Sequence, residues 1–215
     1  IAALGLKNMT INASAIFDVH APLIELITEK VVTGIETDYM GRTVGEAISR
    51  GIMEKPVIFR THGGRPAAID TGRTPIDVAF VAASRADAMG NCTGKFGKSA
   101  CGSLGYAMSE AAHAKKVIVI TDELVPYPLD GFSISEVNVD YVVQVEAIGD
   151  PAGIVSGTTK ITRDPVGLKM ADLAVQTIIA SGLLKDGFSF QTGAGGASLA
   201  AAVFLKDVMV QKHIK

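Results

Sequence analysis

Two continuous apolar runs constrain the fold of this chain most strongly: "DVAFVAAS" at residues 77–84 and "KVIVIT" at residues 116–121. Such runs are typical of strands buried on both faces, as in a parallel sheet covered by helices on each side. We place both at the centre of the sheet. Strand and helix patterns alternate around them, which predicts an α/β fold with a mostly parallel sheet flanked by helices. The expected strands are residues 8–14, 34–39, 57–61, 77–84, 116–121 and 140–146, and the expected helices are residues 22–31, 44–50, 102–115, 165–184 and 198–211.

A polar stretch, "GDPAGIVSGTTKITR" at residues 149–163, interrupts this alternation. It leads into Asp164, a suitable helix N-cap, and Pro165, which suits the first helical position. We therefore predict a first domain at residues 1–150, a linker at 151–164 and the start of a second similar α/β domain at 165–215. The opening "IAALGLKN" resembles the last turn of a helix closed by Gly5, so we expect the chain to be part of something longer.

The composition argues against several classes of protein. The 20 Lys and Arg are scattered among 22 Asp and Glu, which does not favour a nucleic-acid surface. No apolar run approaches the ~18 residues that a membrane-spanning helix needs. Only two cysteines occur, Cys92 and Cys101, so we expect a cytoplasmic protein without a disulfide.

The segment "GFSFQTGAGGASLAAAVFL", residues 187–205, is a second informative feature. An alternating apolar run is followed by a glycine-rich turn at residues 193–196 and then by a helix pattern. Units of strand, glycine turn and helix bring backbone N–H groups up to an anion at the helix N-terminus. The anion would be a phosphate or an oxyanion that forms only during a reaction.

Known nucleotide and metal motifs fit the sequence poorly. "CTGKFGKS" has Cys92 where a phosphate-binding loop has its first glycine, and "GAGGAS" has Ser198 where a dinucleotide fingerprint has its last. The four histidines are dispersed, and the cysteines lack a short spacing. We therefore expect no bound nucleotide and no metal.

Two further stretches combine reactive groups at the ends of expected strands. "FRTHGGRPAAID" places His62, Gly63, Gly64 and Arg65 together, which joins a titratable ring to a bidentate carboxylate binder, although a simple hairpin fits equally well. "TDELVPYP" places Asp122 at the carboxyl end of a central strand, where open α/β sheets bind ligands. Acid–base chemistry or loop capping would both suit that carboxylate.

Several ordered segments carry a resemblance to a known family. "THGGRPAAIDTG", "PIDVAFVAAS", "CGSLGYA", "VIVITDELVPYP", "VDYVVQVEAIGDPAGIVSGTTKITRDP" and "GFSFQTGAGGASLA" resemble the α subunit of citrate lyase. With "VHAPLIE" and "AISRG", the resemblance covers nearly the whole chain. The wider group has a CoA-transferase-like fold of two related α/β domains. The resemblance therefore implies most of the first domain, without its N-terminal part, and only the opening of the second.

The resemblance also implies an activity. Citrate and an acetyl thioester on an acyl carrier protein would give citryl-carrier and acetate, and a separate β subunit would then cleave the citryl group. The chain would hold no cofactor itself but act on the CoA-like prosthetic group of the carrier. A CoA-transferase for another carboxylate and a non-catalytic docking subunit are the alternatives.

Site residues follow from the same resemblance. An attack on a thioester creates an oxyanion, for which the backbone amides of Gly193, Ala194, Gly195 and Gly196 are candidate donors. Relatives use a glutamate of the second domain as a nucleophile; no such motif occurs here, so no nucleophile is assigned. The expected citrate-binding residues are His62, Gly63, Gly64, Arg65 and Asp122, and those for the carrier's phosphorylated arm are Asn91, Lys95 and Lys98. We further expect the chain to self-associate, as a homo-oligomer.

Overall fold

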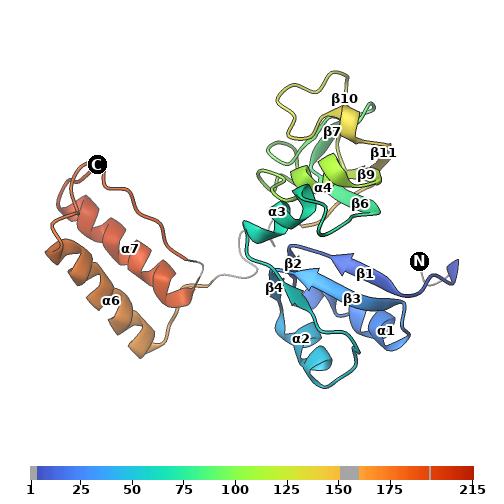
Figure 1. Ribbon diagram of the computed structural model, residues 1–215. Coiled ribbons are helices and arrows are strands. Elements are labelled where there is room, and N and C mark those ends of the chain that lie inside the picture. Colours follow the sequence, from blue (N-terminus) through green and yellow to red (C-terminus); the bar gives the residue numbers. More distant parts are fainter. Residues whose placement is uncertain (1–3, 151–159, 194) are drawn as a thin grey trace. The chain divides into compact units, whose positions relative to one another are not determined.

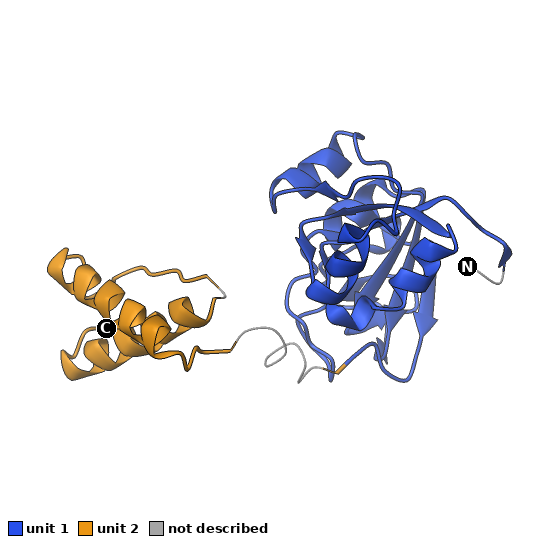
Figure 2. Ribbon diagram, turned by 90° about the horizontal axis from the view of Figure 1, so that it is seen from below, with its two compact units in different colours: residues 1–149 blue, residues 150–215 orange. Residues whose placement is uncertain are grey.

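The computed structural model describes residues 4–150, 160–193 and 195–215. The chain divides into two compact units, residues 1–149 and 150–215 (Figure 2). Most of the expected linker, residues 151–159, lies outside the described residues, as does Ala194. Each unit is described by itself below.

Unit 1 is an α/β structure with mostly parallel strand pairing (Figure 1). Two parallel three-stranded sheets have the orders β1-β3-β5 and β11-β9-β6. A third three-stranded sheet has the order β10-β7-β8, and a two-stranded sheet has the order β2-β4. The pairing of β7 with β8 is antiparallel. The strands are β1 (Met9–Asn12), β2 (Ala15–Ile16), β3 (Val32–Thr37), β4 (Tyr39–Met40), β5 (Ile58–Phe59), β6 (Val78–Ala83), β7 (Arg85–Asp87), β8 (Cys92–Thr93), β9 (Lys116–Thr121), β10 (Leu124–Val125) and β11 (Tyr141–Gln144).

Helices pack beside both three-stranded parallel sheets. Figure 1 shows α1 (Leu23–Thr28) and α2 (Arg42–Ser49) beside β3, and their apolar side chains share a core with that strand. The helices α3 (Gly64–Asp70) and α4 (Ala107–His113) share another core with β6 and β9. The described residues of unit 1 also include the 3₁₀ turns η2 (Asp18–His20) and η3 (Glu136–Asn138). The predicted fold class is confirmed.

The expectation that residues 77–84 and 116–121 form central strands buried on both faces is wrong. Within the described residues β9 is the middle strand of its sheet, but β6 lies at an edge. Alternate residues of β6 are buried and exposed, because successive side chains of a strand point to opposite faces and the helices cover only one. Phe80 of β6 is 61% exposed and pairs in register with Ile118 of β9, which pairs with Tyr141 of β11. Within the described residues of unit 1, this row of side chains is an open apolar face.

Helix bounds differ from the expected ones where glycine sets the backbone. The helix expected from residue 102 begins at Ala107, because Gly102 and Gly105 have φ of +91° and +55°, outside the helical region. Residues 64–70, expected to form a loop or hairpin, form α3 instead. Pro66 lies in the first turn of that helix, where a missing N–H breaks no hydrogen bond.

The described residues of unit 2 form two helices, α6 (Pro165–Ala180) and α7 (Gly196–Gln211), which pack on each other through Ala171, Val175 and Leu205. As predicted, Asp164 caps α6 by accepting a hydrogen bond from the Gly167 N–H at 2.7 Å, and Pro165 begins the helix. The strand expected before the glycine turn is absent from residues 187–193. The described part of unit 2 holds no other strand with which it could pair.

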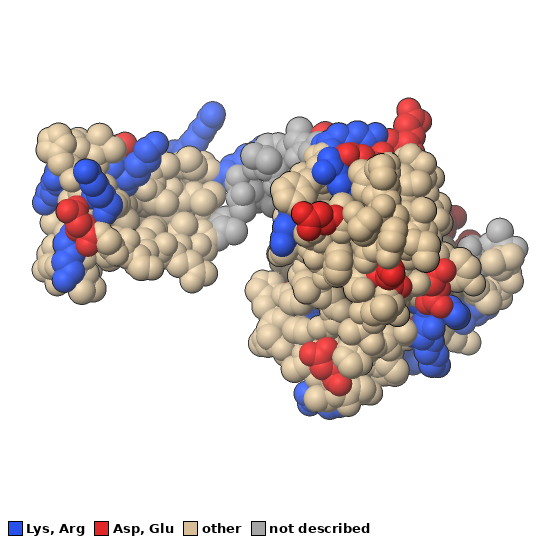
Figure 3. Space-filling view, turned by 90° about the horizontal axis from the view of Figure 1, so that it is seen from above, with Lys and Arg blue, Asp and Glu red and all other residues tan. Residues whose placement is uncertain are grey.

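The surface carries few charges on the face that Figure 3 shows, and both signs are interspersed. Among the described residues, no helix is long and apolar enough to cross a bilayer.

Candidate functional site

A loop at residues 94–101 covers the carboxyl end of the sheet β11-β9-β6. Ser84, which follows β6, donates its hydroxyl to the Phe96 carbonyl at 2.5 Å. Ser99 donates to Oδ2 of Asp122, which follows β9, also at 2.5 Å. Lys98 Nζ donates at 2.7 Å to the carbonyl of Glu146, just beyond β11. The loop therefore contacts the segment after each strand, at the edge where open α/β sheets usually bind ligands.

Gly97 lets this loop approach the sheet closely. Its φ is +98°, and a Cβ there would lie 2.7 Å from both Glu123 Oε2 and the Ser84 carbonyl oxygen. The stretch that resembles a phosphate-binding loop thus packs against the strands. Lys95 and Lys98 are both exposed on it.

Asp122 fixes the loop at residues 94–101 through its side chain. It is buried, and it accepts hydrogen bonds from Ser99 and from the Ile148 N–H, the latter at 3.2 Å. Burial acts to raise the pKa of this carboxyl, but these hydrogen bonds outweigh it and hold the pKa below its ordinary value. No hydrogen bond or ion pair among the described residues joins Asp122 to His62 or Arg65.

Asn91, expected at the carrier's arm, has its side-chain amide occupied within the protein. Its Nδ2 donates to Asp87 Oδ2 at 2.8 Å and to Glu136 Oε2 at 2.7 Å, and its Oδ1 accepts from the Glu136 N–H. Asp87, fully buried, also accepts from the N–H groups of Met89, Gly90, Asn91 and Leu129. The amide has no free N–H for a ligand, so its position indicates a structural role.

The carboxyl end of the sheet β1-β3-β5 carries a different arrangement, which includes His62. His62 follows β5, and its Nδ1 lies 2.5 Å from Oδ2 of Asp38, which follows the neighbouring strand β3. The Asp38 side chain is 3% exposed, whereas the His62 side chain is 86% exposed. The Tyr106 hydroxyl donates to the same Asp38 oxygen at 3.3 Å.

Sequence reasoning missed Asp38 and Tyr106 as partners of His62. The available signal was the "TDY" that follows an expected strand, since neighbouring parallel strands end at the same edge. Burial, together with the negative charge of Asp38, raises the pKa of Tyr106, so its hydroxyl stays a hydrogen-bond donor.

Arg65 is not the exposed cation that was expected to bind a tricarboxylate. It lies within α3, is 0% exposed, and pairs through Nη2 with Glu110 of α4. Its guanidinium lies 6.0 Å from the centre of the Tyr106 ring. Its Nε and Nη1 have no partner within the described residues. Arg65 thus joins the two helices.

Gly63 and Gly64 form the start of α3, beside His62. Gly63 is the N-cap, and the Gly64 N–H donates to Thr61 Oγ1 at 3.0 Å. A Cβ at Gly64 would lie 2.8 Å from that same oxygen, so glycine keeps the turn compact.

The glycine turn in unit 2 leads directly into α7. Gly195 is its N-cap and has no side chain to satisfy the first N–H groups of the helix, which lack partners within it. Gly196 accepts a hydrogen bond from the Thr162 N–H at 3.1 Å, and a Cβ there would lie 2.9 Å from the Lys160 carbonyl oxygen. Gly193 has open space around it, and Ala194 lies outside the described residues.

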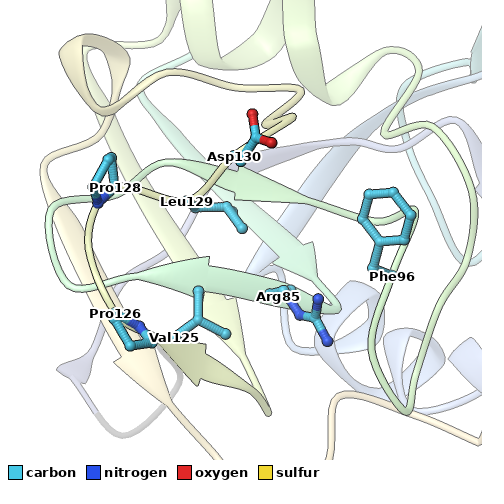
Figure 4. A pocket seen from close by; sticks show the side chains of 7 residues that line it. All are labelled: Arg85, Phe96, Val125, Pro126, Pro128, Leu129 and Asp130. Atoms are coloured by element: carbon cyan, nitrogen blue, oxygen red, sulfur yellow. The ribbon is translucent and has the colours of Figure 1, made fainter.

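An open pocket of ≈ 360 Å³ lies in unit 1 beside the loop at residues 94–101. No sequence pattern indicated this pocket. Figure 4 shows Arg85, Phe96, Val125 and Leu129 among its lining side chains, with Pro126, Pro128 and Asp130 completing it. Arg85 forms an ion pair with Glu123 at 2.5 Å, so its charge is already compensated. Within the described residues, no three His, Cys, Asp or Glu side chains lie close enough to hold a metal ion.

The mostly parallel sheets flanked by helices define an α/β protein, and solved CoA-transferase-like structures share this fold. A solved acyl-CoA transferase from Escherichia coli O157:H7 matches with a TM-score of 0.55 over 79% of this chain and 45% of that chain. At 15% identity the likeness shows the fold alone.

The family is narrower than the fold. The family described as "Citrate lyase, alpha subunit (CitF)" matches residues 1–215, so this chain belongs to the citrate lyase α-subunit family. A curated citrate lyase alpha chain from Escherichia coli K12 is 45% identical over 215 residues, which is 100% of this chain and 42% of the relative. A solved citrate lyase α subunit from Streptococcus mutans, in complex with citrate, is 50% identical with a TM-score of 0.88, over 100% of this chain and 42% of that one. The chain thus spans less than half the length of these relatives.

Proposed function

We propose that this chain is part of the transferase subunit of a citrate lyase. The reaction exchanges acetyl for citryl on an acyl-carrier-protein thioester: citrate and acetyl-carrier give citryl-carrier and acetate. The observation that carries the proposal is the family match over the whole chain, joined to the 50% identical relative whose structure contains citrate.

His62 is the proposed contact for citrate in unit 1. Its ring is 86% exposed while one nitrogen is held by Asp38, so the other nitrogen is available to a carboxylate. Gly63 and Gly64 keep the backbone beside it compact. Arg65 and Asp122 act indirectly, by holding α3 and the loop at residues 94–101 in place.

The amides at the start of α7 are the proposed oxyanion donors. A citrate carboxylate oxygen attacks the acetyl carbon, the C–S bond breaks, and the carrier leaves as a thiolate. The thiolate then attacks the citryl carbonyl of the resulting anhydride and displaces acetate, which gives citryl-carrier. In both steps the negative charge that develops on the carbonyl oxygen is stabilised by N–H groups fixed in advance. Gly195 and Gly196 provide such groups at a helix N-terminus that has no side-chain cap, and Gly193 also lies close to that end of α7 in the sequence. The positive end of the helix dipole favours the same charge.

The proposed partners follow from the reaction. They are citrate, the acyl carrier protein with its CoA-like prosthetic group, and the β subunit that cleaves citryl-carrier. The exposed Lys95 and Lys98 suit the phosphorylated arm of the carrier. We place the complex in the cytoplasm, where cysteines such as Cys92 and Cys101 remain reduced.

Incubation of the full-length subunit with isotopically labelled citrate and acetyl-carrier tests the proposal. Mass spectrometry should find labelled citryl on the carrier and free acetate. A CoA-transferase for another carboxylate would instead load that carboxylate when it is offered, and a docking subunit would leave the acetyl group in place. Either of these results would replace the proposal.

A further inference from the structure

His62, Asp38 and Tyr106 form a connected hydrogen-bonded set at one edge of the sheet β1-β3-β5. Oδ2 of Asp38 lies 2.5 Å from Nδ1 of His62. The same oxygen accepts a hydrogen bond from the Tyr106 hydroxyl at 3.3 Å. The centres of the His62 and Tyr106 rings lie 5.9 Å apart. Three segments distant in sequence thus converge on one carboxylate oxygen.

The chemistry of these groups fixes which ring nitrogen carries a proton. An ionised carboxylate can only accept hydrogen bonds, so the short contact to Asp38 requires the proton on Nδ1 of His62. The buried carboxylate cannot turn toward water for other donors, and its Oδ1 has no partner within the described residues. The Nε2 atom, on the opposite side of the ring, is therefore the nitrogen that remains for a ligand.

The cost of this arrangement argues that it is more than a surface contact. The buried Asp38 carboxylate has lost its hydration, and the hydrogen bonds from His62 and Tyr106 replace only part of it. An exposed ion pair forms with little loss of hydration. Three exposed acids of this chain, Glu54, Asp77 and Asp172, pair with lysines in the ordinary exposed way. The carboxylate of Asp38, in contrast, is shielded and fixed by Tyr106.

We infer that Asp38, supported by Tyr106, is the positioning residue of His62: it directs Nε2 outward to bind a carboxylate group of the substrate. This inference rests on the proposed function for the identity of that substrate. With both ring nitrogens protonated, Nε2–H donates a charge-assisted hydrogen bond to the carboxylate, while the buried charge of Asp38 compensates the ring. No bond to carbon forms at His62, because its role is to hold the substrate.

The first test is spectroscopic and needs no activity. In ¹⁵N spectra of this 215-residue chain, neutral His62 should carry its proton on Nδ1. In Asp38→Asn the amide can present an N–H to the ring, so the proton should move to Nε2. The control variant Asp77→Asn, at an exposed carboxylate, should leave the His62 signals unchanged. Wild-type spectra with the neutral-ring proton on Nε2 would overturn the inference.

The second test measures citrate dependence in the full-length subunit. Asp38→Asn should raise the KM for citrate about tenfold or more while kcat changes less, the scale of one lost charge-assisted hydrogen bond. His62→Gln, at an exposed position, should do the same without loss of folding. Asp38→Asn introduced into the His62→Gln variant should then raise the KM for citrate by less than a further factor of about two. The effects of substitutions at residues that act together are not additive.

If Asp38→Asn raised the KM for citrate equally in the wild type and in the His62→Gln variant, the positioning role of Asp38 would be contradicted. Complete absence of citryl-carrier from the wild-type subunit would instead contradict the proposed function, and the two failures are thereby distinguished.

Discussion

Arg65 of α3 and Glu110 of α4 form an ion pair in which the arginine is fully buried and the Glu110 side chain is 19% exposed. Removing one partner leaves the buried guanidinium without its counter-charge, at a cost of about 3 kcal/mol or more. We therefore expect Glu110→Gln to lower the free energy of unfolding by that amount, as measured by urea denaturation. The control variant Asp77→Ala, which breaks the exposed pair with Lys115, should cost less than about 1 kcal/mol. Similar effects of the two variants would argue against a structural role for Arg65.

The turn before α7 can be tested at Gly195, because the structure leaves room there. The nearest atom to an added Cβ is Ser198 Oγ at 3.6 Å, an ordinary contact, whereas Gly196 packs too closely against Lys160 for a clean substitution. Gly195→Val keeps the backbone N–H but adds a branched side chain that should hinder the approach of the carbonyl oxygen to it. In the full-length subunit the variant should therefore slow acyl transfer by about 100-fold, the usual scale when one oxyanion donor no longer acts. Gly149→Val, at a position with open space outside the proposed site, is the control and should keep a normal rate. A normal rate in Gly195→Val would exclude these amides from the reaction.

Asp87 makes the stability of unit 1 sensitive to acid. Burial acts to raise its pKa, but the hydrogen bonds from Leu129, Asn91, Met89 and Gly90 outweigh burial and lower it. Its contribution to stability is therefore fully present above the unfolded-state pKa of about 3.9 and is lost as the pH falls toward the lower folded-state value. Urea midpoints between pH 7 and pH 3 should show a large deficit for Asp87→Asn at pH 7 that shrinks below about pH 4. A deficit that is constant with pH would contradict this account.

The open face of the sheet β11-β9-β6 should promote self-association. Phe80 is 61% exposed and Tyr141 is 57% exposed, and parallel sheets are rarely left uncovered. Light scattering of this chain should show a mass that rises with concentration, and Phe80→Thr should weaken that rise. Val137→Thr, at an isolated residue that is 82% exposed, should have no such effect. A clean monomer in the wild type would refute the expectation of self-association.

Local patterns were sufficient to predict much of the fold. The strand at Lys116–Thr121 has the expected bounds, and Asp164 with Pro165 begins α6 as capping chemistry requires. Because such signals are read within a few residues, they do not depend on tertiary contacts. The short helix α3 was missed, since its glycines and proline are equally typical of a turn.

The candidate site depended on contacts between distant residues and could be predicted only in part. His62 was identified, but its partner Asp38 lies 24 residues away and becomes a neighbour only because β3 pairs with β5. Arg65 was expected to be exposed and to bind citrate. Its burial could not be predicted from the sequence, because it follows from the packing of α3 on α4. Asp122 was placed correctly at the end of its strand, yet the loop that covers it could not be foreseen from spacing.

The mass of the acyl carrier protein after incubation with the full-length subunit tests the central claim most directly. With citrate present, we predict that the acetyl-carrier signal is replaced by citryl-carrier, and that His62→Gln reaches half its maximal rate only at about tenfold higher citrate. A carrier that keeps its acetyl group in the presence of the wild-type subunit and saturating citrate would contradict the account.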